Sequence, residues 1–278
     1  MESNKKGDST LKNVADYIGV SVSTVSRVLS GKASDYRISK ETEENVRKAA
    51  EKLNYSPNQL ARGLRLKKTN VIGLVIPDIS NPFFASVARS IEIEARKVKY
   101  SIMLCDSQES TKIEIDSIHL LQSRKVDGLI ICPVGQDYEH LKRLYNNGTP
   151  VVVVDRYFPQ LKCPYVVSNN YKGAEEAVSY FIENGHRIIG CIQGLLHTSV
   201  NNDRVRGYKD AHKIHDIPLD DTLIIGDSFG ERNGYIGAKI LLNRAERPTA
   251  IFATSNLISL GALRAISEEG LKIPDDIS

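Results

Sequence analysis

The sequence is poor in the residues on which metal, redox and disulfide chemistry depends. It has 278 residues, with no tryptophan, 2 methionines and 4 cysteines. The cysteines lie far apart and mostly within apolar stretches, at Cys105, Cys132, Cys163 and Cys191. None forms a C-x-x-C pair, and no cysteine–histidine cluster has the spacing of a zinc site. We therefore expect free thiols, no metal ion and no cofactor, as is usual in a reducing compartment.

Long apolar runs are absent as well. No stretch approaches the roughly 20 consecutive apolar residues that a membrane-spanning helix needs. The N-terminal sequence MESNKKGDST lacks the apolar core of a secretory signal. The composition, 41% hydrophobic and 26% charged, is ordinary for a globular protein. We expect a cytoplasmic protein with no membrane partner.

Catalytic motifs are also missing. The sequence contains no G-x-S-x-G elbow, no phosphate-binding loop of the Walker type and no glycine-rich dinucleotide fingerprint after a strand. Its histidines show no spacing to a nucleophile or carboxylate, and we interpret His186, in the sequence NGHR, as a turn residue. These absences argue against an enzyme.

The charged residues are distributed unevenly along the chain. Residues 1–68 contain 14 lysines and arginines against 8 acidic residues, whereas residues 69–278 contain 23 against 26. The N-terminal part is basic, and the rest of the chain is slightly acidic. This distribution predicts that the N-terminal part binds nucleic acid and that the rest binds a different ligand.

Two short helical patterns separated by a glycine occupy residues 10–31. Thr10 and Ser21 stand at the positions of N-caps, and Gly19 interrupts the pattern between them. The expected buried residues are Leu11, Val14, Ala15 and Ile18 in the first helix and Val22, Val25, Val28 and Leu29 in the second. Such a pair predicts a helix-turn-helix. The alternative is an ordinary helical hairpin with a polar face.

Two further helical segments follow. Ser39 predicts the start of a helix that runs to about Leu53 and completes a small bundle. Residues 55–65 begin another helix at Pro57, but this helix is short and contains Gly63. We expect it to be unstable without a partner for its apolar face.

From Val71 onward, apolar strand patterns alternate with helical ones. The predicted strands are 71–76, 101–105, 128–132, 151–154, 188–192, 223–225 and 250–253. The predicted helices are 83–97, 113–123, 138–146, 172–183, 204–215, 232–243 and 257–269. This alternation is typical of α/β folds with a parallel sheet covered on both faces. Ligands of such sheets bind at the carboxyl ends of the strands.

Several motifs occur in one order along almost the whole chain. They are TLKNVADYIGVSVSTVSRVLSG (10–31), YSPNQLARGLR (55–65), IGLVIPDISNPFF (72–84), VDGLIICP (126–133), PVVVVDR (150–156), NGHRIIG (184–190), RVRGY (204–208) and LGALRAI (260–266). Together they resemble the lactose-repressor (LacI/GalR) family of bacterial transcription regulators.

The resemblance implies an all-α helix-turn-helix headpiece over residues 1–55 and a hinge helix with its linker over 56–68. It implies a periplasmic-binding-protein-like core over 69–278, built from two doubly wound parallel-sheet subdomains at about 69–168 and 169–278. It also implies a homodimeric regulator that binds operator DNA under the control of a small sugar-like effector. Of the two kinds of regulator, we expect a repressor and not an activator.

Family resemblance also assigns DNA contacts. Val22, Ser23 and Arg27 match the positions that read bases in the major groove, while Ser21 and Ser26 are expected to contact phosphates. For Val22, core packing is an equal alternative. In the hinge, Leu64 matches a leucine that enters the minor groove. The other hinge residues expected to contact DNA are Asn58, Arg62 and Arg65.

The effector site is likewise implied by the resemblance. Asp155 and Arg204 match the acceptor and the principal arginine of the site, and their alternative is a surface charge pair. Phe84 and Phe229 are candidates to stack on a flat sugar or base face, with core packing as the alternative. The remaining candidates are Arg156 and Ser255.

The chain departs from the family pattern in two places. The loop between Ser30 and Ser39 is longer than the resemblance implies. The sequence also stops at the segment PDDIS (274–278), where the family begins another strand, so we expect the C-terminal part of the core to be incomplete. Two other readings stay open: a transport-type sugar-binding protein with the same core, and a doubly wound enzyme with a DNA-binding appendage.

Overall fold

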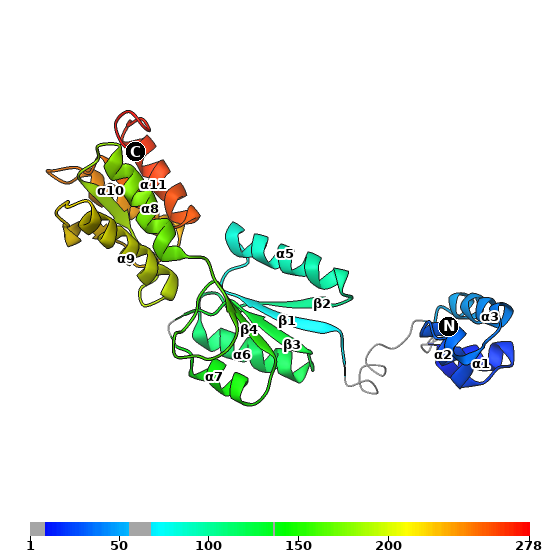
Figure 1. Cartoon of the computed structure of the whole chain (residues 1–278). Coiled ribbons are helices and arrows are strands. Elements are labelled where there is room, and N and C mark those ends of the chain that lie inside the picture. Colours follow the sequence, from blue (N-terminus) through cyan, green and yellow to red (C-terminus); the bar gives the residue numbers. More distant parts are fainter. Residues whose placement is uncertain (1–8, 56–67, 136) are drawn as a thin grey trace, which may run out of the picture. The chain divides into compact units, whose positions relative to one another are not determined.

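The computed structural model describes residues 9–55, 68–135 and 137–278. The chain divides into two compact units, Met1–Thr69 and Asn70–Ser278, a small helical unit and a larger α/β unit (Figure 1). No helix in the described part is both long enough and apolar enough to cross a membrane. All four cysteines are free, as expected.

The helical unit contains three α-helices and a short 3₁₀ helix within its described residues. These are α1 (Leu11–Ile18), α2 (Val22–Leu29), η1 (Ser34–Tyr36) and α3 (Lys40–Lys52). The side chains of Thr10, Ser21 and Ser39 cap the three α-helices, each accepting a backbone N–H of the first turn. Val14, Val25, Val28, Val46 and Ala49 form the shared core.

The structure contradicts the predicted burial of Val22 in this unit. Val22 is 44% exposed, whereas Val25 and Val28 are fully buried. Val22 is the first residue of α2, and its side chain lies beyond the reach of the core that α1 and α3 supply. Its helical spacing to Val25 alone did not reveal this.

The first half of the α/β unit, the N-subdomain, is built on a parallel sheet in the order β2-β1-β3-β4-β5. Its strands are β1 (Val71–Ile76), β2 (Ser101–Asp106), β3 (Gly128–Ile131), β4 (Val151–Val154) and β5 (Tyr165–Val166). Its helices are α5 (Pro82–Lys97), α6 (Thr111–Ser123) and α7 (Glu139–Asn146). Helix α5 covers one face of the sheet, and α6 and α7 cover the other (Figure 1).

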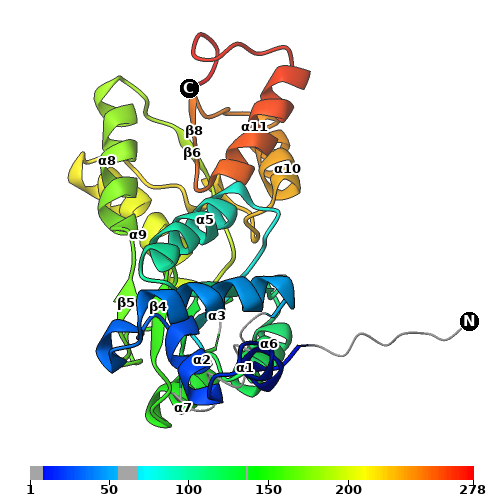
Figure 2. The same ribbon diagram turned by 90° about the vertical axis from the view of Figure 1, so that its right-hand side faces the viewer.

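The second half, the C-subdomain, has a parallel sheet in the order β7-β6-β8. Its strands are β6 (Ile189–Ile192), β7 (Ile224–Ile225) and β8 (Ala250–Ala253), and a short 3₁₀ helix η2 (Asp221–Leu223) precedes β7. Its helices are α8 (Asn170–Glu183), α9 (Ser199–Ile214), α10 (Glu231–Leu242) and α11 (Asn256–Glu268). Helices α8 and α9 pack on one face of the sheet, and α10 and α11 pack on the other (Figure 2).

Helices α10 and α11 pack closely because glycine faces backbone at their contact. A Cβ added to Gly261 would lie 1.9 Å from the carbonyl oxygen of Glu231, and one added to Gly234 would lie 2.0 Å from that of Ile258. Any larger residue at either position would force the two helices apart.

The α/β class and the parallel sheets are as predicted, with two differences in the elements. The sequence did not predict β5, because two exposed residues at a sheet edge carry no apolar run. Helix α9 begins at Ser199 rather than at Arg204, because Thr198 caps it and its first turn is polar. Arg204 therefore lies within the helix, one turn after its start.

Candidate DNA-binding and effector sites

The outer face of α2 carries the predicted base-reading side chains. Val22, Ser23 and Arg27 are all exposed. The buried Val25 and Val28 lie on the opposite side of the helix. Core packing is therefore excluded for Val22, and the three side chains are accessible to a partner.

The serines of α2 have partners within the helix. The Ser21 hydroxyl accepts the backbone N–H of Thr24 at 3.1 Å and lies 2.7 Å from the hydroxyl of Ser23. Ser26 is half-buried. Because Ser21 caps the helix, it also orients the first-turn N–H groups, which are ready donors for a phosphate.

The predicted hinge contacts lie outside the described residues. Asn58, Arg62, Leu64 and Arg65 all fall within residues 56–67, and their DNA contacts stay predictions.

A cavity of about 430 Å³ lies at the carboxyl ends of the strands in the α/β unit, where such folds bind ligands. All the predicted effector residues line it: Phe84, Asp155, Arg156, Arg204, Phe229 and Ser255. Phe84, Asp155 and Arg156 come from the N-subdomain and the others from the C-subdomain. The cavity thus joins residues that are far apart in the sequence.

Arg204 lies within α9 and projects from it into the cavity. Its Nε donates to the side-chain oxygen of Asn170 at 2.9 Å, and its Nη1 donates to the carbonyl oxygen of Thr254. Burial lowers the pKa of the Arg204 guanidinium, and the nearby Asp155 opposes that shift. Both of its partners are uncharged, so the positive charge is available to a ligand.

Asp155 follows β4 in a left-handed conformation, with φ of 68°. The N–H of Arg156 donates to the carbonyl of Val154 at 2.9 Å, which makes Asp155 the centre of a γ-turn. Burial raises the pKa of the Asp155 carboxyl, against the attraction of Arg156 and Arg204. The strained turn places a carboxylate that is 12% exposed in the cavity wall. Asp155 and Arg204 are both partly buried and are therefore not surface charges.

Arg156 is almost fully committed to partners inside the protein. Its Nη1 and Nη2 each donate to Glu109 at 2.7 Å, and Nη1 also donates to the carbonyls of Pro133 and Val134. Its Nε is buried, has no hydrogen-bond partner among the described residues and lies 4.0 Å from Oδ2 of Asp155. Arg156 therefore braces the cavity wall mainly through contacts inside the protein.

The two phenylalanines face the Arg156 guanidinium. Its carbon lies 5.8 Å from the ring centre of Phe84 and 5.3 Å from that of Phe229. Phe84 also belongs to the core around Leu74, whereas Phe229 is half-buried and packs against Gly194. Each ring thus packs in the protein and also lines the cavity.

Ser255 stands at the end of β8 and caps α11. Its hydroxyl accepts the N–H of Ile258 at 3.3 Å and lies 3.5 Å from the carbonyl oxygen of Phe229. The residue that follows it, Asn256, also lines the cavity.

Several supporting residues were not predicted. Asn81 lines the cavity and caps α5, accepting the N–H of Phe83 at 3.0 Å. The sequence Asn-Pro after a strand was a signal for it. Glu109 pairs with Arg156 across 47 residues of sequence, and Asn170 bonds Arg204 across 34. No sequence pattern identifies such long-range pairs.

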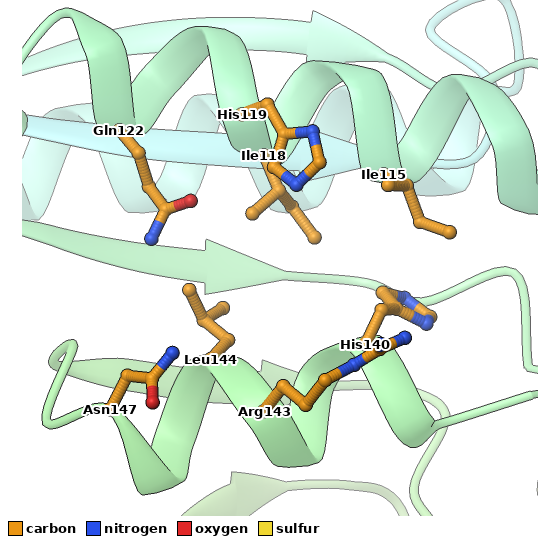
Figure 3. Close-up of a pocket in the computed structure, with 8 residues that line it drawn as sticks. All are labelled: Ile115, Ile118, His119, Gln122, His140, Arg143, Leu144 and Asn147. Carbon is orange, nitrogen blue, oxygen red and sulfur yellow. The ribbon is translucent and has the colours of Figure 1, made fainter.

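A second hollow, of about 300 Å³, lies between α6 and α7. Figure 3 shows Ile118 and Leu144 pointing toward each other there from the two helices. His140, at one end, places its Nε2 2.5 Å from the buried carboxylate of Glu114, which also accepts the N–H of Val134. This network supports the loop that binds Arg156, and the hollow contains none of the predicted effector residues.

Comparison with known proteins decides the family. Residues 69–278 match the family model described as periplasmic binding proteins and the sugar-binding domain of the LacI family. Residues 10–58 match the model of bacterial regulatory proteins of the lacI family. The chain belongs to the LacI family.

Individual LacI-family relatives agree with this assignment. The transcriptional regulator DegA of Bacillus subtilis (strain 168) is 34% identical over 273 residues, which are 97% of this chain and 80% of the relative. The ribose operon repressor of Haemophilus influenzae is 34% identical over 270 residues, with the same shares. The crystal structure of the Lac repressor dimer bound to operator and the anti-inducer ONPF has a TM-score of 0.86 and 26% identity, covering 98% of this chain and 81% of that one.

As a LacI-family member, the chain is a DNA-binding transcription regulator and not an enzyme. The predicted family, fold class and regulatory function are confirmed. The readings as a transport protein or as an enzyme with a DNA-binding appendage are set aside, because the match to the regulator family includes the helix-turn-helix.

Proposed function

We propose that this regulator is a cytoplasmic homodimeric repressor whose affinity for operator DNA is set by a sugar-like effector bound in the 430 Å³ cavity. The observation that carries the proposal is the convergence of Asp155, Arg204 and two aromatic rings on that one cavity. The family model for these residues is itself described as a sugar-binding domain.

The chemistry of the cavity suits a polyhydroxylated ligand. Sugar sites combine apolar walls with a few convergent polar groups. The Asp155 carboxylate accepts hydrogen bonds from hydroxyls, and the Arg204 guanidinium donates them. Phe84 and Phe229 offer flat faces to the apolar side of a sugar ring. The name of the ribose operon repressor and the solved CelR–cellobiose complex among the matches support the same ligand class.

The DNA site follows from the exposed face of α2. We place this helix in the major groove, where Arg27 pairs with guanine, Ser23 bonds a base edge and Val22 contacts a thymine methyl. Ser21 and Ser26 contact phosphates. The hinge residues Asn58, Arg62, Leu64 and Arg65 add minor-groove contacts.

The homodimer is supported by an exposed apolar surface on the C-subdomain. Helices α10 and α11 present Ile236, Ile240, Leu260 and Leu263, which are 45%, 48%, 51% and 48% exposed. Large apolar side chains left exposed on neighbouring helices are typical of association surfaces. A two-fold pairing would place one copy of this surface against the other.

Two measurements test the proposal. Selection from a random DNA library with the whole chain should yield a two-fold symmetric consensus site. A thermal-shift screen of sugars should then find a compound that raises the melting temperature and changes the affinity for that site. Failure to enrich any site would contradict the DNA reading function. Sugars that leave both the melting temperature and DNA affinity unchanged would contradict the effector assignment.

A further inference from the structure

Tyr36 covers one face of the Arg27 guanidinium. The guanidinium carbon of Arg27 lies 3.9 Å from the centre of the Tyr36 ring. Within the described residues, the Arg27 side chain makes no hydrogen bond and no ion pair. The stacking contact is therefore its one fixed interaction in the described part of the chain.

The segment that carries Tyr36 is the long loop noted in the sequence. The loop is ordered, because its backbone makes hydrogen bonds with the end of α2 and within itself. The N–H of Lys32 donates to the carbonyl of Arg27 at 2.9 Å, and that of Ile38 donates to Ala33 at 3.0 Å. Ala33 is 3% exposed within the core of the headpiece. The 3₁₀ turn thus holds the Tyr36 ring at a set place beside α2.

Stacking leaves the hydrogen-bonding edges of the arginine free. The N–H groups of a guanidinium lie in its plane, so a ring above that plane restricts its orientation without consuming a donor. A bidentate bond to guanine needs two of those N–H groups in one plane with the base. An arginine held in advance loses less freedom when it binds than one that samples all its rotamers.

We infer that Tyr36 is a positioning residue, which stacks on Arg27 and holds its guanidinium ready for base recognition. The inference rests on the proposed role of Arg27 in reading DNA. It gives the long loop between Ser30 and Ser39 a function: the loop supplies an aromatic support for the arginine of the recognition helix.

A double-mutant cycle on the whole chain tests the inference, with the DNA site selected by the unaltered protein. Tyr36→Ala should weaken binding to that site by roughly two- to fivefold, the range that corresponds to the energies estimated for exposed cation–π contacts. In the Arg27→Ala background the same change should have no effect, because the group it positions is gone. Tyr36→Phe, which keeps the ring, should bind as the unaltered protein does. Tyr36→Leu should behave like Tyr36→Ala.

Tyr17 provides the matched control. It is another exposed tyrosine of the headpiece, 51% exposed in α1, and its ring contacts Lys52 rather than Arg27. Tyr17→Ala should change DNA affinity by the same factor with and without Arg27. Melting curves of all variants check that the headpiece stays folded.

The outcomes separate the inference from the proposed function. If Arg27→Ala weakens the selected site but Tyr36→Ala does not, or if Tyr36→Ala acts equally in both backgrounds, the positioning role is overturned and base reading by Arg27 stands. If Arg27→Ala leaves affinity and consensus unchanged, the base-reading role itself fails, and the inference fails with it. A gain of affinity in Tyr36→Ala would mean that the ring withholds the arginine, which also contradicts the inference.

Discussion

Arg27 in the headpiece and Arg156 in the core both stand at predicted binding positions, but they differ in burial and in partners. Arg27 is exposed and has one stacked aromatic ring beside it. Arg156 is 1% exposed and bonds a carboxylate and two carbonyls. Similarity of position therefore does not determine what an arginine does. An arginine whose donors are satisfied inside the protein supports the fold, and one whose donors are free can bind a partner.

Arg204 lies between these extremes. It is partly buried and held by two uncharged acceptors, so its direction is set while its charge stays uncompensated by a direct ion pair. This is the state expected of a ligand-binding group, which is oriented in advance and still able to gain from an added partner.

The largest effect should come from Arg156, which makes the most hydrogen bonds inside the protein of the three arginines. Arg156→Ala leaves the exposed Glu109 carboxylate and two buried carbonyls without their donor. Leaving a buried acceptor unsatisfied costs about 1–3 kcal/mol, so the two carbonyls together should cost about 2–6 kcal/mol. The free energy of unfolding of the α/β unit, measured by urea denaturation, should fall by that amount. The control is Arg96→Ala, which removes an exposed pair with Glu92 and should cost about 1 kcal/mol or less. If both variants lost the same free energy of unfolding, Arg156 would stabilise the fold no more than an exposed arginine does.

The next largest effect concerns effector binding. Arg204→Ala should lower the affinity for the sugar found by thermal shift about ten- to hundredfold, because hydrogen bonds to a charged group contribute about 1.5–3 kcal/mol. Calorimetric titration measures the loss. Arg206, two residues along α9, is exposed and paired with Asp203, so Arg206→Ala should leave sugar affinity unchanged. Comparable losses in the two variants would move the effector site away from this cavity.

The headpiece arginine should act on DNA alone. Arg27→Ala should cost about 1–3 kcal/mol on the selected site and relax the preference at one base pair. Repeating the library selection with the variant checks this. Sugar-induced thermal shifts should be the same as in the unaltered protein. An identical consensus with and without Arg27 would show that it contacts no base.

The smallest effect is a pH dependence of stability that arises at Asp155. Burial raises the pKa of this carboxyl above its ordinary value of 3.8. Between the ordinary and the raised pKa, the folded protein binds more protons than the unfolded chain, so the free energy of unfolding falls as pH rises. Denaturation across this window should show that slope, and Asp155→Asn should flatten it.

Asp220 supplies a control of opposite sign. A hydrogen bond from the Thr222 hydroxyl lowers the pKa of the Asp220 carboxyl. The stability that Asp220 contributes is therefore present above its ordinary pKa and is lost as pH falls. Asp220→Asn should remove a slope opposite to that of Asp155, and slopes of the same sign in the two variants would contradict the assigned burial of Asp155.

Much of the fold could be predicted because its elements carry strong patterns. The caps at Thr10, Ser21 and Ser39 and the apolar strands of both sheets follow local rules, and the structure has them where the sequence indicates. Strand β5 could not be predicted, because its pairing with β4 is set by the rest of the sheet and not by its own two residues.

The sequence predicted which residues line the candidate effector site, but not their hydrogen-bond partners or their burial. The family motifs predicted Asp155 and Arg204 as effector residues, and both line one cavity. The pairing of Arg156 with Glu109 depends on the approach of two loops, and no periodicity encodes it. In the headpiece, the exposure of Val22 likewise depends on where α1 and α3 end.

The proposed repressor requires that a ligand bound in the core changes the affinity of the headpiece for DNA. Fluorescence anisotropy with the selected DNA site, in the presence and absence of the sugar that shifts melting, tests it directly. We predict a change in affinity of about 5- to 150-fold, the usual size of coupling between two sites, with little change for a scrambled DNA at the same salt concentration. Identical titration curves on the selected site with and without a bound sugar would show that the core does not control DNA binding.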